Sequence, residues 1–268
     1  MAITVNTNVF SLAAQRNVNR TLGNLETAMQ RLSSGLRINM AKDDAAGLAV
    51  AARMEVQARG SEVAQRNIQD GISALQVGDN TLRTTNDILQ RMRELIVQFK
   101  SGTYTSVDQK MMQLEYNQLE SEITDTFGRG RFNGQAVLSN TLSGLTIQAG
   151  ANAADVLSID ADIKTTTVTN KVGAIGAASA MDVIDCALDM VNSGLAKIGS
   201  FQSRLDKALS SAMSVEEAQW AARGRIMDAD FARETARMTS AQVIQQAGIS
   251  ALSQANTIPQ LALGLLGG

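Results

Sequence analysis

The chain has 268 residues and a formal net charge of −2, with 24 basic and 26 acidic residues, no histidine and one cysteine. Charges of both signs are interspersed, so no basic patch predicts binding of nucleic acid or of an anionic membrane. No apolar run reaches the roughly 20 residues that cross a bilayer, and we expect no membrane insertion. Aromatic residues make up only 3%, which favours long helices packed side by side over a thick globular core.

An apolar stripe near the amino terminus predicts the first helix, from about residue 8 to residue 36. Its members are spaced four and three residues apart, so they lie on one side of a helix. The following segment, SSGLRINMAKDDAAGLA at 33–49, interrupts the heptads and predicts a spoke between two helical regions. The members of the stripe are Val18, Leu22, Leu25, Met29, Leu32 and Leu36.

Adjacent aspartates, Asp43 and Asp44, close this spoke. A pair of carboxylates can hold a metal, but negative charge at the first turn of a helix also meets the helix dipole and caps free N–H groups. We expect the capping role, and we expect no metal or cofactor site in the chain. The absence of histidine removes His-based acid–base catalysis, Ser-His triads and the HExxH zinc helix, so we expect no enzyme.

A long second helix is expected from about Asp44 to Phe99. Its apolar residues recur at a seven-residue spacing, which keeps them on one face. A turn at 101–106 and a shorter helix at 108–127 should follow it. The residues of the long stripe are Ile68, Leu75, Leu82, Leu89 and Ile96.

Between about residues 128 and 165 the apolar period changes from near 3.6 to 2. Leu145 and Ile147 alternate with polar residues, and Leu157 and Ile159 do the same after the sequence GANAAD. Alternation on both sides of a turn predicts a β-hairpin. Asn133-Gly134 predicts a turn at the start of this segment.

From about Gly176 the seven-residue spacing returns and predicts a helix that packs against the first long one. We expect a break at residues 223–225 and a terminal helix from Phe231 to Leu265. Apolar stripes at both ends of a chain need a partner, either each other or another copy of the chain. The two stripes of this half are Ile184, Val191, Ile198 and Leu205, and then Ile244, Ala251, Ile258 and Leu265.

Several long segments, in order along nearly the whole chain, resemble the signatures of bacterial flagellins. They are MAITVNTN at the start, MQRLSSGLRIN at 29–39, AKDDAAGLA at 41–49, LQRMRELIVQ at 89–98, RFNGQAVL at 131–138, DADFARETARMTSAQVIQQAG at 228–248 and LSQANTIPQLALGLL at 252–266. The chain is similar to a short form of the family that lacks the variable outer domains.

The resemblance implies a mainly α fold, an elongated antiparallel helical bundle and coiled coil with a small β-hairpin. Residues 1–42 and 223–268 would form an inner terminal coiled coil, and residues 43–222 an outer helical bundle with the hairpin at about 128–165. The apolar residues expected in the terminal coiled coil are Leu22, Leu25, Met29, Leu32, Ile244, Ala251, Ile258 and Leu265.

The function implied is that of a structural subunit of the bacterial flagellar filament, which polymerises into a helical propeller for motility. Such a protein is secreted, exported through the flagellum without a signal peptide, and found in the extracellular filament. Its partners would be other copies of itself, an export chaperone, and the cap and hook-associated proteins. A hook-filament junction protein is the alternative within this class. A non-flagellar coiled-coil tether or adhesin is the alternative from another class.

The resemblance also marks a candidate face on the long helix and the helix after it. Gln90, Arg91, Leu95 and Glu115 match positions that related flagellins present to Toll-like receptor 5, and the same face should contact a neighbouring subunit. Periodicity separately predicts that Leu89 lies in the bundle interior. Arg91, about 200° further round the helix, should then face outward.

Overall fold

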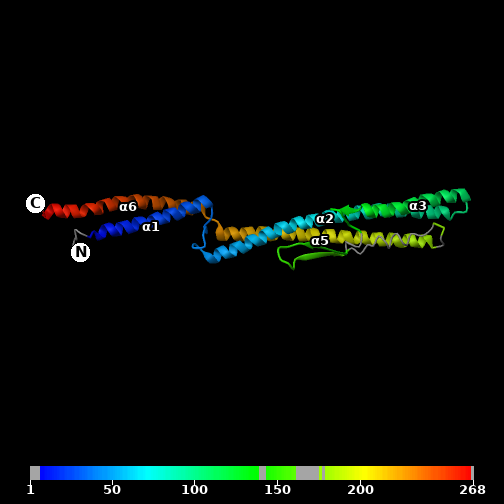
Figure 1. The fold of residues 1–268 in the computed structure, drawn as a ribbon, viewed down its shortest axis with the longest axis horizontal. Helices are drawn as coiled ribbons and strands as arrows, with labels where there is room; N and C mark the ends of the chain where they lie inside the picture. Colours follow the sequence, from blue (N-terminus) through cyan, green and yellow to red (C-terminus); the bar gives the residue numbers. More distant parts are fainter. Residues whose placement is uncertain (1–6, 139–142, 161–174, 177–178, 267–268) are drawn as a thin grey trace. The chain divides into compact units, whose positions relative to one another are not determined.

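The computed structural model describes residues 7–138, 143–160, 175–176 and 179–266, and the side chains of residues 143–145, 160 and 258–266 lie outside this description. Helices dominate the described chain (Figure 1), which confirms the mainly α class. Among the described helices, none combines the length and apolarity that a bilayer crossing needs. In chain order the elements are α1 (Val9–Ser34), α2 (Ala45–Phe99), α3 (Ser106–Arg129), β1 (Arg131–Phe132), β2 (Gln135–Ala136), β3 (Ser143–Gln148), β4 (Val156–Asp160), α5 (Ala180–Met227) and α6 (Phe231–Leu266).

The chain divides into two compact units. The first, called the terminal unit here, comprises Met1–Glu55 and Gln219–Gly268. The second, called the central unit, comprises Val56–Ala218. The long helices α2 and α5 therefore contribute to both units, and each unit is described by itself below.

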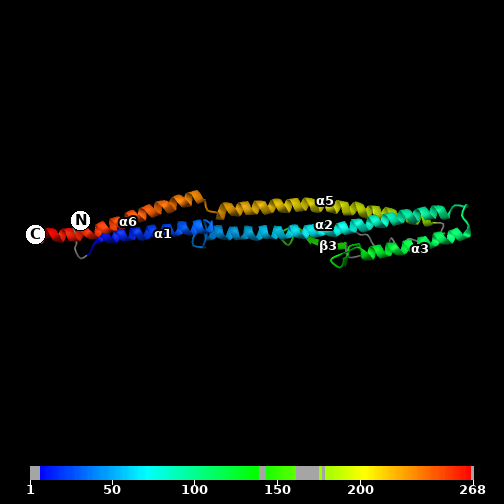
Figure 2. The same cartoon turned by 90° about the horizontal axis from the view of Figure 1, so that it is seen from above.

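In the terminal unit, α1 and α6 lie side by side and run in opposite directions (Figures 1 and 2). Near one end of the pair, Asn8 Nδ2 donates a hydrogen bond to the Ala255 carbonyl at 2.8 Å. Near the other end, Arg31 and Glu234 approach to 3.5 Å. The two helices expected at the ends of the chain are thus confirmed, and they contact each other.

Polar side chains and one glycine set the ends of these helices. The Asn8 side chain accepts from the Ser11 N–H at the start of α1, and Gly35 ends α1 in the left-handed region at φ 71°. Asp230 Oδ1 accepts from the backbone N–H of Arg233 in the first turn of α6. These contacts satisfy N–H groups that have no partner inside a helix, and only glycine adopts a positive φ without steric cost.

The adjacent aspartates of the spoke have different partners. Asp44 Oδ1 accepts from the Gly47 N–H at 2.8 Å, which confirms the cap expected at the start of α2. Asp43 Oδ2 accepts from the N–H groups of Met40 and Asn39, one turn earlier in the chain. These backbone hydrogen bonds lower the pKa of the Asp43 carboxyl below its ordinary value.

The break before the terminal helix lies later than expected. The prediction of a break at residues 223–225 is wrong, because α5 continues without interruption to Met227. Contacts hold this last turn: Arg223 pairs with Glu55 at 3.3 Å and its guanidinium lies over the Trp220 ring. The chain leaves the helix at Asp228, where it forms an antiparallel bridge with Leu36. Tertiary contacts therefore outweigh the low helix propensity of Gly224.

The core of the central unit is built from the expected heptads. Along α2 and α5 the predicted stripe residues are all buried, and α3 adds Tyr116, Ile123 and Phe127 to the same cluster. Polar pairs link α2 to α5 in antiparallel register at Gln65–Glu216 and Arg93–Asp185. The buried stripe residues are Ile68, Leu75, Leu82, Leu89 and Ile96 of α2, and Ile184, Val191, Ile198 and Leu205 of α5.

The region expected to hold a β-hairpin contains two of them among the described residues. Strands β1 and β2 pair antiparallel across a tight turn at Asn133 and Gly134, whose φ angles are 50° and 77°. Both values are positive, as in the type I′ turns that Asn-Gly favours. Strands β3 and β4 form the second hairpin, with Ile147 opposite Leu157.

A row of small residues along α2 makes room for these hairpins. A Cβ atom built on Gly60 would lie 2.6 Å from the Ala151 Cβ, and one on Gly78 would lie 3.1 Å from Val137 Cγ1. On the same row, Gly71 lies directly beneath the end of the Ile147 side chain. The absence of side chains at these glycines lets the hairpins approach the helix backbone closely.

A candidate assembly surface on the terminal helices

The residues expected in the terminal coiled coil differ in their exposure. Leu22, Met29 and Ile244 are 39%, 54% and 53% exposed, and Ala251 is also exposed. Leu25 and Leu32 are half-buried. Ile258 and Leu265 belong to α6, but their side chains lie outside the described residues. Of the two partners expected for these stripes, the other helix of the chain or another copy, the exposure of Leu22, Met29, Ile244 and Ala251 leaves them open to another copy.

The contact within the chain is made largely by small residues. Gly248 of α6 faces α1 closely: a Cβ atom at this glycine would come within 2.9 Å of Val18 Cγ2. Small side chains let two helix backbones approach closely, while several large apolar residues of both helices remain exposed. The buried apolar residues of this contact are Ala28, Ala241 and Ala255.

The pattern of the largest apolar residues does not predict this seam. A signal was present, since Glu234, Ala241, Gly248 and Ala255 recur at a seven-residue spacing. The structure shows that this row, and not the row of Ile244 and Ala251, faces α1.

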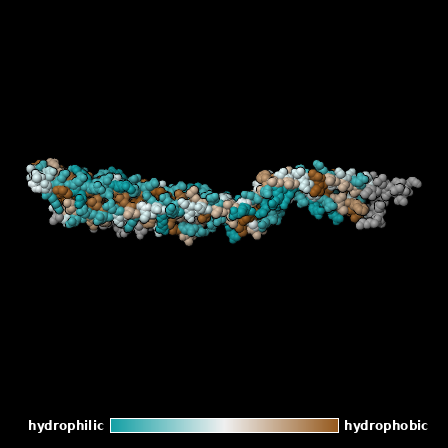
Figure 3. All heavy atoms as spheres, turned by 180° about the vertical axis from the view of Figure 1, so that it is seen from behind, coloured by the Kyte–Doolittle hydropathy of each residue, from teal (hydrophilic) through white to brown (hydrophobic). Residues whose placement is uncertain are grey.

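Large apolar side chains are consequently exposed on both terminal helices. Figure 3 shows hydrophobic residues among hydrophilic ones on the part of the surface that α1 and α6 form. Exposed large apolar side chains on two adjacent helices can be covered by another protein. The exposed residues are Val9, Leu12, Leu22 and Met29 of α1, and Phe231, Val243, Ile244 and Ile249 of α6.

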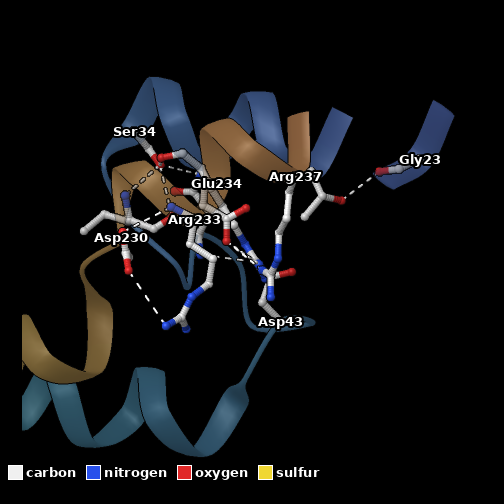
Figure 4. Close-up of polar contacts among 11 residues, drawn as sticks. Gly23, Ser34, Asp43, Asp230, Arg233, Glu234 and Arg237 are labelled. Carbon is white, nitrogen blue, oxygen red and sulfur yellow. Dashed lines mark hydrogen bonds and ion pairs between the residues drawn. The ribbon is translucent and has the colours of Figure 1, made fainter. Parts of the chain in front are cut away.

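A charged cluster lies at one end of the α1–α6 seam. Glu234 is only 4% exposed, and its Oε1 lies 2.8 Å from Arg237 Nη1 and 3.5 Å from Arg31 Nη1. Figure 4 shows Glu234 and Arg237 together on α6, with Arg233 directed toward Asp230 at the start of the helix. A buried carboxylate must be paired to be stable, so these arginines hold Glu234 in place.

The second candidate face lies in the central unit, where α2 and α3 meet. Gln90, Arg91 and Glu115 are exposed there. Arg91 Nη2 lies 2.8 Å from Glu115 Oε1, and Arg91 Nη1 also contacts Glu94 at 3.0 Å. The hydrogen bonds from Arg91 to Glu115 and then to Glu94 raise the arginine pKa above its ordinary value. Arg91 therefore faces outward as expected, but its guanidinium is already paired within the chain.

Leu95 does not belong to this face. It is 1% exposed and forms part of the central hydrophobic core, as does Leu89, which is fully buried as expected. The expectation that Leu95 lies with Gln90, Arg91 and Glu115 on an exposed surface is wrong. Leu95 follows Arg91 by one helical turn, but the α2 face that packs on the bundle is wide enough to include it.

Across the described ranges, no group of three or more His, Cys, Asp or Glu side chains is placed to hold a metal ion. The geometry of the terminal unit instead provides apolar surface beside paired charges. Such a surface can bind another protein through shape and charge.

Comparison with known proteins agrees with these features. The family model described as "Bacterial flagellin N-terminal helical region" matches residues 5–143, and "Bacterial flagellin C-terminal helical region" matches residues 181–266. A flagellin of Halalkalibacterium halodurans is 38% identical over 98% of this chain and 99% of that protein.

Two further flagellar proteins are similar to this chain. The flagellar filament 33 kDa core protein of Treponema phagedenis is 34% identical over 98% of this chain and 99% of that protein. A crystal structure of Bacillus cereus flagellin is 30% identical, covers 55% of this chain and 88% of that chain, and has a TM-score of 0.48. With both family regions matched in order and relatives aligned along nearly its whole length, the chain belongs to the bacterial flagellin family.

Proposed function

We propose that the chain polymerises into the flagellar filament chiefly through the exposed apolar faces of α1 and α6. As a flagellin, it is a structural subunit of that filament. The observation that carries the proposal is the contrast between a seam of small residues inside the α1–α6 pair and large apolar residues outside it. Burial of apolar surface contributes roughly 25 cal/mol per Å², so these faces favour association with other copies.

The arrangement fits a polymer better than a closed oligomer. A filament subunit must contact neighbours on more than one side, whereas a closed dimer needs a single self-complementary patch. Large apolar residues lie on several sides of the helix pair, for example Leu22 and Met29 on α1, and Phe231 and Val243 on α6. Interfaces that do not close build open helical assemblies.

Electron microscopy of the purified protein tests this proposal directly. We expect long helical filaments of uniform diameter in negative stain, formed above a critical protein concentration. A hook-filament junction protein or a coiled-coil tether would instead give monomers or small oligomers of fixed size. Such small species at every concentration tested would contradict the proposal.

The proposal also includes an export route and further partners. Both are inferred from membership of the family. The subunit would travel through the growing flagellum with an export chaperone and assemble under a cap, next to hook-associated proteins. Residues 1–42 and 223–268 would form the inner part of the filament, and residues 43–222 the outer part. This division describes the assembled state and remains a prediction.

Recognition by Toll-like receptor 5 is proposed for the exposed face with Gln90, Arg91 and Glu115. The support is that these polar side chains are exposed together at the junction of α2 and α3. Receptor signalling by wild-type monomer and by an Arg91→Ala, Glu115→Ala double variant tests the idea. We expect a loss of signalling without unfolding, and unchanged signalling would contradict the assignment of this face.

A further inference from the structure

A groove of about 630 Å³ runs beside the α1–α6 seam in the terminal unit. One end of the groove carries guanidinium groups, and the other end carries the exposed side chain of Ile244. Hydroxyl and amide groups line the wall between the two ends. The polar and charged lining residues are Thr21, Asn24, Thr27, Arg31, Arg233, Glu234, Arg237 and Ser240.

The charges in this groove are not balanced. Glu234 is shared by Arg31 and Arg237, and Arg233 reaches Asp230 only at 3.8 Å. Arg31 Nε is shielded from solvent and has no hydrogen-bond partner among the described residues. Three arginines and one carboxylate line the groove, while Asp230 and Asp43 act on Arg233 and Arg31 from outside the lining. The lining itself therefore carries a net positive charge and can accept a further carboxylate.

The opposite flank of α1 presents a matching feature. Leu22, Glu26 and Met29 are spaced four and three residues apart, so they share one face of the helix, and all three are exposed. Glu26 is the one acidic residue of α1. Within the described part of the chain its carboxylate takes part in no hydrogen bond or ion pair.

The two features cannot meet within one chain. At about 100° per residue, the α1 residues of the groove, such as Asn24 and Arg31, lie on the other side of the helix from Leu22 and Glu26. A projecting acidic face on one flank and a basic groove on the other form a heterologous pair of surfaces. Repetition of such a contact gives an open polymer and not a closed dimer.

We propose that in the filament Glu26 of one subunit enters the groove of a neighbouring subunit and pairs with Arg31, Arg233 and Arg237. Leu22 and Met29, on either side of Glu26, cover the apolar end of the groove at Ile244. This inference rests on the proposed function, since it names the partner surfaces of polymerisation. It explains why α1 leaves its acidic side chain exposed between two large apolar residues.

The first test is a double-variant cycle on polymerisation. Glu26→Gln and Arg237→Gln should each raise the critical concentration by about tenfold or more, the change that about 1.4 kcal/mol of contact energy gives. The double variant should be little worse than either single variant, because both remove the same contact. Arg20→Gln is the matched control, since Arg20 is an exposed α1 residue outside the groove.

Measurements on the monomer show whether a substitution acts by disturbing contacts inside one chain. Arg237→Gln also weakens the pair with Glu234, so its monomer is examined by circular dichroism and thermal unfolding, whereas Glu26→Gln removes no contact within the described residues. Equal assembly by wild type and Glu26→Gln would overturn the proposal. Fully additive effects of Glu26→Gln and Arg237→Gln would also overturn it.

The second test places the two residues directly. In a Cys186→Ser background, chains with Glu26→Cys are mixed with chains with Arg237→Cys, polymerised, and treated with a short bismaleimide. We expect a crosslinked dimer that does not form when Arg20→Cys replaces Glu26→Cys, nor in unpolymerised protein. Filaments of the mixed Glu26→Cys and Arg237→Cys chains that give no such dimer would overturn the Glu26 contact alone, whereas failure of the wild-type chain to form filaments would contradict the proposed function.

Discussion

At the level of single residues, Tyr116 on α3 is a polar group that the fold buries without compensation. It is 1% exposed within the central core, and its hydroxyl has no hydrogen-bond partner among the described residues. A buried hydroxyl without a partner destabilises a fold, because it loses its hydrogen bonds to water. Burial, and then the negative charge of Glu120, raises the pKa of Tyr116 to about 12.

We expect Tyr116→Phe to stabilise the monomer by about 1 kcal/mol, since it removes the hydroxyl and keeps the ring. Thermal and denaturant unfolding of the monomer measure this change at neutral pH. A less stable variant would contradict the account, because it would show that the hydroxyl has a partner in solution.

The raised pKa of Tyr116 also predicts that the stability of the fold depends on pH in the alkaline range. Between pH 10 and pH 12 the unfolded chain loses the Tyr116 proton while the folded chain keeps it. The unfolded state then binds fewer protons, so the stability of the fold falls as pH rises through this range. Unfolding of wild type and Tyr116→Phe should therefore diverge above pH 10, and parallel curves would argue against a buried neutral hydroxyl.

The different environments of Leu89, Leu95 and Arg91 predict different effects of substitution. Leu89→Ala and Leu95→Ala each open a cavity in the core and should destabilise the monomer by about 2 to 5 kcal/mol. Arg91→Ala removes exposed ion pairs with Glu115 and Glu94, so monomer stability should change little. Chemical denaturation compares the three, and a Leu95→Ala protein as stable as wild type would contradict its burial.

At the level of elements, the hairpins depend on the small residues of α2. Gly60 lies against the backbone and Cβ of Ala151, whereas Gly199 of α5 has no atom within 4 Å of the position of a Cβ. Both glycines are inside helices, where alanine has the higher propensity by roughly 0.5 to 1 kcal/mol. They therefore differ in contact with a neighbour and not in local backbone preference.

We expect opposite outcomes at these two glycines. Gly199→Ala should stabilise the monomer by about 0.5 to 1 kcal/mol through helix propensity alone. Gly60→Ala should lose this gain and displace the turn at Ala151, because the Ala151 Cβ and Cα lie 2.6 and 3.1 Å from the position of the new Cβ. Denaturation curves and the rate of proteolysis near residues 150–155 measure both effects. If Gly60→Ala were as stable as Gly199→Ala, the close contact would be refuted.

The helices could be predicted from the sequence, because their heptads extend over many turns and their caps are local. The stripe from Ile68 to Ile96 lies as the periodicity indicates, and Asp44 caps α2 as its chemistry indicates. The break at Asp228 was misplaced, since the contacts of Arg223 with Glu55 and Trp220 come from tertiary structure. Similarly, periodicity identifies an apolar stripe but does not say whether a helix of the same chain or another molecule covers it.

The candidate sites show the same limit. Leu95 matches a pattern shared with related proteins, but its burial depends on how widely the bundle covers α2. In the terminal unit the sequence indicated the correct helices but not which residues form the contact between them. The close seam uses Gly248 and Ala241, small residues that a search for large apolar side chains passes over.

At the level of the whole molecule, our proposal assigns stability and assembly to different surfaces. The central unit has a continuous core of leucine and isoleucine heptads, which can stabilise it as a monomer. The pair of α1 and α6 buries Ala28, Ala241 and Ala255 and leaves several large apolar residues exposed. We therefore expect assembly to depend on the terminal helices far more than the folding of the central unit does.

The most direct measurement compares sedimentation and negative-stain images of the full chain with those of a chain lacking residues 1–36. Our account predicts that the full chain forms long filaments that sediment, and that the shortened chain stays in the supernatant with its central helices folded by circular dichroism. Filaments of normal diameter from the shortened chain would contradict the claim that the terminal helices are the assembly surface.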